Sequence, residues 1–179
     1  MRRPALFAAF ASCAILAGGG QAHARNNSCE AFKAYLQKNL ADLSPQFVRP
    51  VVVTRGAGPA NDLLDLVTSK RIDGQLACDG DRFVRFEARI ALPADPALRD
   101  GFYRIQETAI RVKFGWSAAR AARLIHSMTA EAADYLRGSA ERGDHFVSGK
   151  VERHEGEAGD VGMIWTSADR TFILVAYTP

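Results

Sequence analysis

The chain has few of the residues that most often carry chemistry. Its 179 residues include only three cysteines and four histidines. It contains no G-x-S-x-G motif of a serine hydrolase, and no glycine-rich loop lies between a strand and a helix with the spacing that phosphate binding requires. The glycine-rich runs at residues 18–20 and 56–58 are better explained as the end of an apolar leader and as a turn. The sequence therefore predicts no cofactor and has no catalytic signature.

A strong excess of charge of one sign is also lacking. The formal net charge is +3, from 23 Lys and Arg against 20 Asp and Glu. Without Arg2 and Arg3, 21 basic residues remain against 20 acidic ones, a net charge of +1. A nucleic-acid partner is not predicted, because binding phosphates requires an excess of Lys and Arg. No apolar run after residue 24 is long enough to cross a membrane.

The N-terminus has the pattern of a secretory signal peptide. Residues 1–3 are short and basic, residues 5–18 are apolar, and residues 22–24 form an A-x-A cleavage site. Cleavage after Ala24 would leave residues 25–179, the length of a single ordinary domain. The alternative is an uncleaved membrane anchor, although the apolar run is short for a span. We expect a periplasmic or secreted protein.

Two cysteines, Cys29 and Cys78, remain after the leader. An even pair in an exported protein predicts a disulfide. Two buried thiols are the alternative, and a metal pair is less well supported because no other Cys or His lies at ligand spacing from either residue. A bridge would close a loop of about fifty residues, for which the chain-entropy model gives about 4 kcal/mol of stabilisation.

An amphipathic helix is predicted from Cys29, with Asn27 as its N-cap and Glu30 in the capping-box position. Its apolar face contains Cys29, Phe32, Leu36, Leu40 and Leu43. A strand is expected within residues 47–55. Residues 61–68 fit a short helix and a strand equally well, because their apolar residues follow neither period clearly.

A β-hairpin is predicted over residues 71–91. Its apolar positions are Ile72, Gly74, Leu76 and Cys78 on the first strand and Val84, Phe86, Ala88 and Ile90 on the second. A two-residue turn at residues 79–80 would place these two sets on opposite faces. A three-residue loop at residues 78–80 pairs Leu76 with Arg82 and brings both sets to one side, so we predict this loop. The intervening Arg85, Glu87 and Arg89 should then face solvent as a strip of alternating charge.

A pair of helices is predicted from Asp95, which can cap the first helix ahead of Pro96. The apolar stripe of this helix is Leu98, Phe102, Ile105, Ala109, Val112 and Trp116. Gly115 interrupts the pattern, and Ser117 can cap a second helix; one helix kinked at residues 114–116 is the alternative to two. The second stripe is Ala121, Leu124, Ile125, Met128, Ala132, Tyr135 and Leu136. The alternation of residues 110–116 also fits a half-buried strand, which is the alternative there.

Three further strands are expected after the helices. Residues 146–154 alternate as a half-exposed strand, residues 161–166 follow a turn, and residues 171–177 are apolar on both faces and should be central. The order of elements predicts an α+β fold. We expect an antiparallel sheet of about five to six strands, with the N-terminal helix and the central helical pair packed on one face.

The polar residues near His154 form the only cluster that warrants a test for metal binding. His154 and Glu155 are the candidate ligands, within the carboxylate-rich segment 152–160. His145 has the opposite strand parity to His154, so the two could share a metal only across a bulge. A zinc site requires three or four converging ligands. His126 lies on the polar side of its predicted helix and is expected to be solvated.

Two classes of function are compatible with these features. The near-neutral charge, the few histidines and the missing nucleophile motif favour a non-catalytic binding or assembly module. Such a module would hold a periplasmic protein segment or an apolar ligand on the sheet face, or in the groove between helices and sheet. The alternative is a metal-dependent or acid/base enzyme with its site near the Glu152–Asp160 loop.

Overall fold

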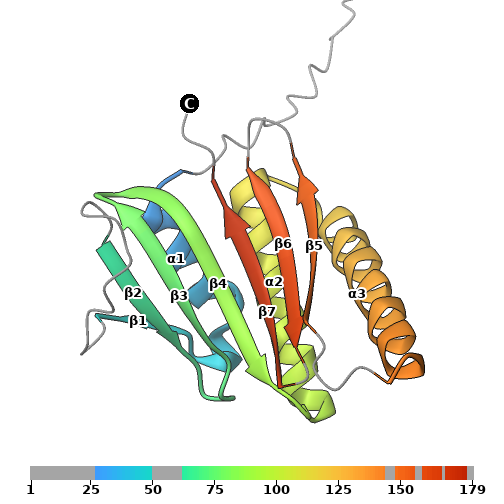
Figure 1. The fold of residues 1–179 in the computed structure, drawn as a ribbon. Coiled ribbons are helices and arrows are strands. Elements are labelled where there is room, and N and C mark those ends of the chain that lie inside the picture. Colours follow the sequence, from blue (N-terminus) through green and yellow to red (C-terminus); the bar gives the residue numbers. More distant parts are fainter. Residues whose placement is uncertain (1–26, 50–61, 144–147, 156–158, 167, 177–179) are drawn as a thin grey trace, which may run out of the picture.

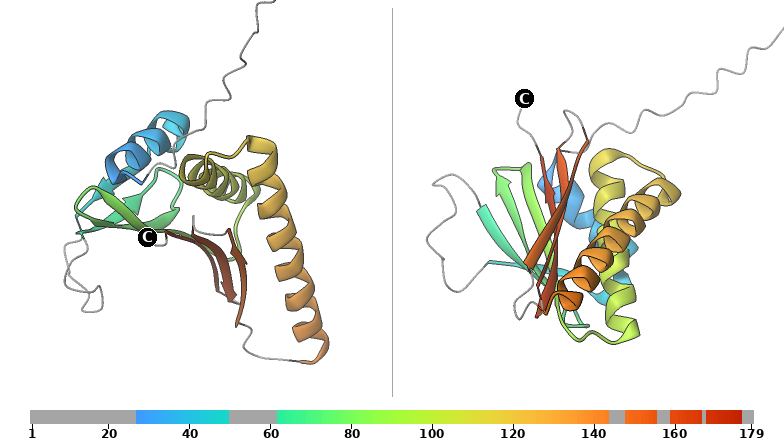
Figure 2. Two further views of the ribbon diagram at one scale, coloured as in Figure 1. Left: turned by 90° about the horizontal axis from the view of Figure 1, so that it is seen from above. Right: turned by 45° about the vertical axis from the view of Figure 1, so that its right-hand side comes forward.

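The computed structural model describes residues 27–49, 62–143, 148–155, 159–166 and 168–176. In chain order its elements are α1 (Cys29–Asn39), the 3-10 helix η1 (Ala41–Leu43), β1 (Gln46–Val48), β2 (Asp62–Val67), β3 (Asp73–Asp79), β4 (Arg82–Ala91), α2 (Pro96–Phe114), α3 (Ala118–Glu141), β5 (Ser148–His154), β6 (Asp160–Thr166) and β7 (Asp169–Val175). The strands form one antiparallel sheet, and the three α-helices lie on one side of it (Figures 1 and 2). The predicted α+β class is confirmed, but the described residues form seven strands where five to six were expected.

The order of strands in the sheet is β1-β2-β3-β4-β7-β6-β5. The first four strands form a meander, in which residues 62–67 are a strand and not the alternative short helix. After β4 the chain passes through α2 and α3 to the far edge of the sheet and then returns as β5, β6 and β7 (Figure 1). Strand β7 therefore lies between β4 and β6, in the central position that its apolar sequence predicted.

The break between the two long helices occurs at Gly115. Helix α2 continues through Phe114, and Gly115 ends it with a φ of 66°, a left-handed conformation that glycine adopts without strain. The backbone N–H of Arg120 then donates to the hydroxyl of Ser117 at 3.3 Å, which caps the start of α3. The strand alternative for residues 110–116 is therefore wrong.

The caps of α1 and α2 were predicted with different success. Asp95 caps α2 as expected, by accepting a backbone hydrogen bond from its first turn. Helix α1 is capped by Ser28, whose hydroxyl accepts from the N–H of Ala31 at 3.1 Å. The predicted cap, Asn27, instead accepts a hydrogen bond from Lys113 of α2, so the capping box assigned to Asn27 is wrong.

The β3–β4 hairpin has a different register from the predicted one. Asp79 pairs with Arg82 across a two-residue turn at residues 80–81, whose glycine has a φ of 59°. A β-bulge beyond the next pair shifts the register, so that Leu76 lies opposite Phe86 and not opposite Arg82. The predicted three-residue loop was meant to bring the apolar residues of both strands to one face. The bulge does this instead, because it inserts one extra residue into β4.

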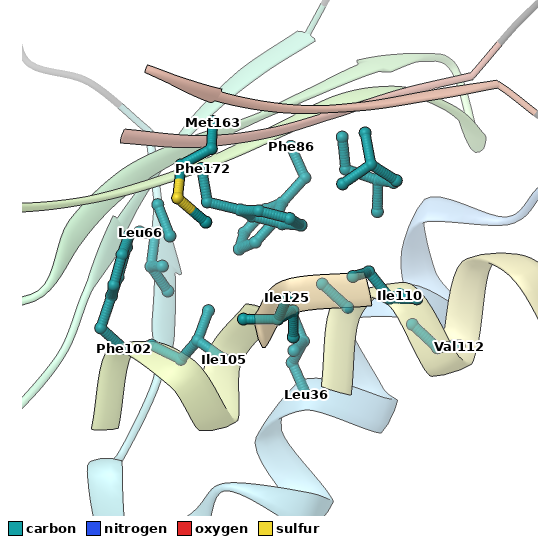
Figure 3. Packing of buried hydrophobic residues seen from close by; sticks show 14 of the residues in the cluster. Leu36, Leu66, Phe86, Phe102, Ile105, Ile110, Val112, Ile125, Met163 and Phe172 are labelled. Carbon is teal, nitrogen blue, oxygen red and sulfur yellow. The ribbon is translucent and has the colours of Figure 1, made fainter. Parts of the chain in front are cut away.

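The core lies between the sheet and the three helices (Figure 3). Its aromatic centre joins α1 to β4, where the ring of Phe32 lies 4.7 Å from that of Phe83 and 5.1 Å from that of Phe86. Because of the bulge, Phe83 fills the core position that was predicted for Val84. The buried members of the two predicted helix stripes are Phe102, Ile105, Ala109, Val112, Ala121, Ile125, Met128 and Ala132. Tyr135, by contrast, is 47% exposed.

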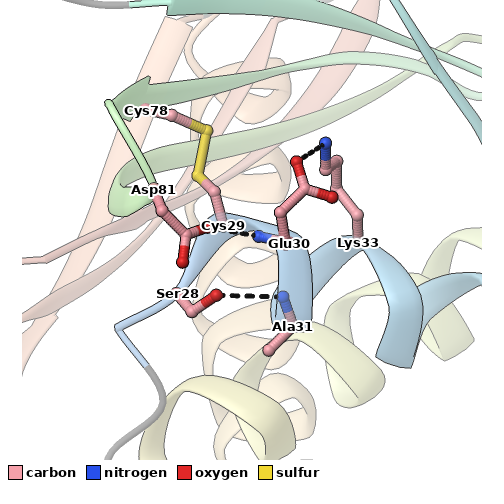
Figure 4. Close-up of polar contacts among 7 residues, drawn as sticks. All are labelled: Ser28, Cys29, Glu30, Ala31, Lys33, Cys78 and Asp81. Atoms are coloured by element: carbon pink, nitrogen blue, oxygen red, sulfur yellow. Dashed lines mark hydrogen bonds and ion pairs between the residues drawn. A yellow bond between two sulfur atoms is a disulfide. The ribbon is translucent and has the colours of Figure 1, made fainter.

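A disulfide joins Cys29 at the start of α1 to Cys78 in β3, as predicted (Figure 4). Both cysteines are buried, and their Cα atoms are 6.2 Å apart. Asp81, in the hairpin turn, accepts from the N–H of Cys29 at 2.6 Å through its backbone and from the N–H of Glu30 at 2.9 Å through its carboxylate. The first turn of α1 is thus tied to the hairpin by one covalent bond and two hydrogen bonds.

Some predictions concern residues outside the described ranges. The leader in residues 1–24 is among them, as is the part of the predicted 47–55 strand beyond Arg49. Within the described helices, none is long and apolar enough to cross a membrane. That finding and the disulfide are compatible with an extracytoplasmic protein.

Candidate functional site

We call the sheet face opposite the three helices the open face (Figure 2). No helix of the described chain packs on it. Its side chains follow from the alternation along each strand and from the register between strands. Across the middle of the face, one row contains Asp65, Gln75, Glu87, Ile173, Gly162 and Glu152, each directly opposite the next.

Two strips of alternating charge border an apolar floor on the open face. The floor is formed by Ile164, Ile173 and Val175 on β6 and β7, with the hydroxyl-bearing Thr171 beside them, and all four are buried or half-buried. Strand β4 supplies the first strip, Arg85, Glu87 and Arg89, which faces away from the core as predicted. Strand β5 supplies the second strip, Lys150, Glu152 and His154. Arg85 forms an ion pair with Glu87, and Lys150 forms one with Glu152.

Exposed apolar side chains lie toward the β1 end of the open face. Val48 is 42% exposed and Val67 is 48% exposed, against 2% for Leu66, which points to the core between them. In the described chain, only these two valines and Tyr135 are large apolar residues with such exposure. Two of the three therefore lie on the open face, where a partner could cover them.

A depression of about 410 Å³ lies on the open face beside Val67. Its lining residues come from β2, β3, β4 and β7 and are Asp65, Leu66, Val67, Asp73, Gly74, Gln75, Glu87, Arg89 and Thr171. The lining includes three carboxylates and one guanidinium. Asp65 is held in place by a 3.1 Å hydrogen bond from the side-chain amide of Gln75, and Arg89 lies directly opposite Asp73. The depression therefore combines an excess of negative charge with one exposed valine.

The two candidate metal ligands, His154 and Glu155, have different partners in the structure. His154 and Asp160 are directly opposite each other on β5 and β6, with Nδ1 and Oδ1 2.9 Å apart. Glu155 instead forms a 3.5 Å ion pair with Arg120 of α3, and His145 lies outside the described residues. Among the residues that the structure describes, no three His, Cys, Asp or Glu side chains lie close enough together to hold a metal.

Arg120 connects the β5–β6 turn to the junction of the two long helices. Its guanidinium carbon lies 3.6 Å from the centroid of the Trp116 ring, a cation–π geometry, while its ion pair reaches Glu155. Glu155 is thereby engaged in holding α3 against the hairpin. His126 is exposed as predicted, with its ring 6.5 Å from that of Tyr103.

Two carboxyl groups away from the open face have clearly perturbed titration. The side-chain hydrogen bonds from Arg104 lower the pKa of Asp42, because they stabilise the ionised form. The backbone N–H of Glu30 lowers the pKa of Asp81 in the same way. Both groups connect helices to their surroundings, so these shifts concern stability and not the depression.

Sequence reasoning identified the charged strip of β4 but missed the depression beside it. The residues that were missed are Asp65 and Val67 of β2 and Asp73 of β3. The assignment of Asp65 and Val67 depended on residues 61–68 being a strand, which the local pattern left open. No protein-family model, curated protein or solved structure was found to match this chain.

Proposed function

We propose that the protein is an exported, non-catalytic binding module that holds a basic segment of another protein on its open face. The depression lined by Asp65, Asp73 and Glu87 is the observation that carries this proposal. A lysine or arginine side chain entering the depression would be attracted, because its three carboxylates outnumber its one guanidinium. The exposed side chains of Val48 and Val67 would cover apolar atoms of the same segment.

The lining of the depression favours a protein segment over an apolar ligand, the other candidate from the sequence. An apolar ligand would remove the carboxylates from water without giving them hydrogen-bond partners, which is unfavourable. A peptide offers both backbone N–H groups and cationic side chains as donors. The mixed lining, with one exposed valine at its border, matches that combination.

Export is the second part of the proposal. It is supported by the basic, apolar and A-x-A pattern of residues 1–24 and by the Cys29–Cys78 disulfide, since such bonds persist in oxidising compartments. The enzymatic alternative near residues 152–160 has less support. There His154 has Asp160 beside it, but the second candidate ligand, Glu155, is paired with Arg120.

Binding to a peptide array tests the proposal and its charge preference. We expect bound peptides to be enriched in Lys and Arg and to dissociate as the salt concentration rises, because exposed charge pairs are screened. Asp73→Lys should abolish that binding, since it reverses a charge in the lining of the depression. Asp134→Lys is the matched control, because it makes the same change at an exposed position of α3. Peptides that bind without basic enrichment, or equal loss in both variants, would contradict the proposal.

A further inference from the structure

Strand β5 forms one edge of the sheet, and its outer side is a second surface at which a partner could bind. It pairs with β6 over seven residues, Ser148–His154, without a register shift. Among the described residues no strand lies on its other side. Exposed edges are commonly blocked by a proline, a bulge or charged side chains. Strand β5 has no proline and no bulge, but it carries Lys150, Glu152 and Arg153. Strand β1 at the opposite edge has three residues.

Helix α3 borders β5 on the helix side of the sheet. Glu131 of α3 forms an ion pair with Arg153, and the Tyr135 hydroxyl lies 3.5 Å from the carbonyl oxygen of Ser148. The first turn of α3 also reaches the far end of β5, through the ion pair between Arg120 and Glu155. The side chains of Lys150 and Glu152 point to the opposite, open face, and both residues are exposed.

We propose that β5 pairs with β5 of a second copy of this chain, antiparallel about a two-fold axis at Val151. The sequence of the strand is self-complementary in that register. Lys150 lies opposite Glu152 of the partner subunit, and the symmetry repeats this pair on the other side of the axis. Val151 meets Val151 of the partner subunit. The outermost pair joins Ser148 to His154 of the partner subunit, two side chains that can form a hydrogen bond.

The charges of β5 select this register over its neighbours. A shift of two residues in one direction places Glu152 opposite Glu152 of the partner subunit, and a shift in the other direction places Lys150 opposite Lys150 of the partner subunit. Like charges directly opposite each other destabilise a strand pair. A shift of one residue would turn the open face of one copy toward the helix side of the other. The alternating charges that discourage pairing with other strands therefore fit a second copy in one arrangement.

The resulting dimer would have one sheet running through both copies, with both open faces on the same side. Pairing of β5 is independent of the proposed peptide binding, because it involves the outer edge of β5 and not the depression. The depression is lined from β2, β3, β4 and β7. Failure of one proposal would therefore leave the other standing.

Sedimentation velocity over a concentration series, on the chain expressed with its own N-terminal segment, tests the pairing. The wild-type protein should form a dimer. Lys150→Glu places two pairs of glutamates opposite each other, and Glu152→Lys places two pairs of lysines opposite each other. Each variant should weaken dimerisation by about tenfold or more. Both positions are exposed, so circular dichroism should show an unchanged fold.

Mixing the two variants provides the decisive control. A Lys150→Glu chain and a Glu152→Lys chain are complementary to each other, so an equal mixture should form a heterodimer, which native mass spectrometry detects. The double variant Lys150→Glu/Glu152→Lys should recover self-association. A wild-type protein that stays monomeric at hundreds of micromolar would overturn the proposal, as would single variants that dimerise normally or a mixture that forms no heterodimer.

Discussion

Loss of the Cys29–Cys78 bridge should lower the free energy of unfolding by about 4 kcal/mol. The two cysteines are 49 residues apart, and closing a loop of that length removes about this much conformational entropy from the unfolded chain in the chain-entropy model. For a domain of this size, about 1 kcal/mol corresponds to roughly 2–4 °C in melting temperature. Reduction should therefore lower the melting temperature by roughly 8–16 °C, as an upper value.

Local contacts should keep the reduced protein folded. The hydrogen bonds from Cys29 and Glu30 to Asp81 remain, so the first turn of α1 stays on the hairpin at low temperature. The destabilisation should consequently appear as a lower melting temperature and not as lost helix content at 20 °C.

Differential scanning calorimetry with and without reductant measures this effect. Peptide mapping by mass spectrometry without reduction should first identify a single Cys29–Cys78 linkage. The double variant Cys29→Ala/Cys78→Ala is the control, because reductant should not change its melting temperature. An unchanged melting temperature in wild-type protein with demonstrably reduced thiols would refute the reasoning.

Three other predictions follow from the helices and the leader. Phe102→Asp should unfold the domain, because truncating a buried Phe costs about 3–5 kcal/mol and burying an unpaired carboxylate adds to that cost. Arg123→Asp, at an exposed position, should leave the domain folded, and thermal melting followed by circular dichroism compares the two variants. Hydrogen bonds from Arg104 lower the folded-state pKa of Asp42, so ionised Asp42 should stabilise the fold above its ordinary pKa near 3.8, and this stabilisation should be lost as the pH falls below that value. Urea unfolding should therefore show that Asp42→Asn is less stable than the wild type at pH 7 but equally stable at pH 2. Intact mass of the exported protein should correspond to cleavage after Ala24, and a retained leader would contradict that prediction.

Features determined by neighbouring residues were predicted well from the sequence. The spacing of apolar residues predicted both long helices and their buried faces, and Gly115 marked the boundary between them. The disulfide followed from the cysteine count and from the position of Cys29 on an apolar helix face. These predictions succeed because the period of the apolar residues is a local property of the chain.

Features that depend on residues far apart in the sequence could not be predicted from local patterns. The bulge between residues 77 and 78 of β3 and their partners on β4 has no local marker. The hairpin register was therefore wrong, although the facing of its side chains was right except at Phe83 and Val84. Arg104 occupies an exposed helix position by periodicity, yet it binds Asp42, 62 residues away, through two hydrogen bonds of 2.7 Å. It is therefore unsuitable as a neutral control for Phe102→Asp.

Of the candidate sites, the one formed by residues close in sequence was anticipated, and the one formed by distant strands was not. The proximity of His154 and Asp160 follows from the β5–β6 register, and both lay in the segment that the sequence singled out. The depression combines β2, β3 and β4 with β7, which joins them only through the order of strands in the sheet. Its three carboxylates therefore gave no local sign that they would share a site.

Site-specific photo-crosslinking in the exporting cell tests the central claim, that the open face binds a protein segment. A photoreactive residue at Thr171, in the lining of the depression, should crosslink to a partner, and added Asp73→Lys should remove that product. The same residue at Ala130, exposed on α3, should give no such product. A product at Ala130 but not at Thr171, or a Thr171 product that Asp73→Lys leaves unchanged, would contradict the claim.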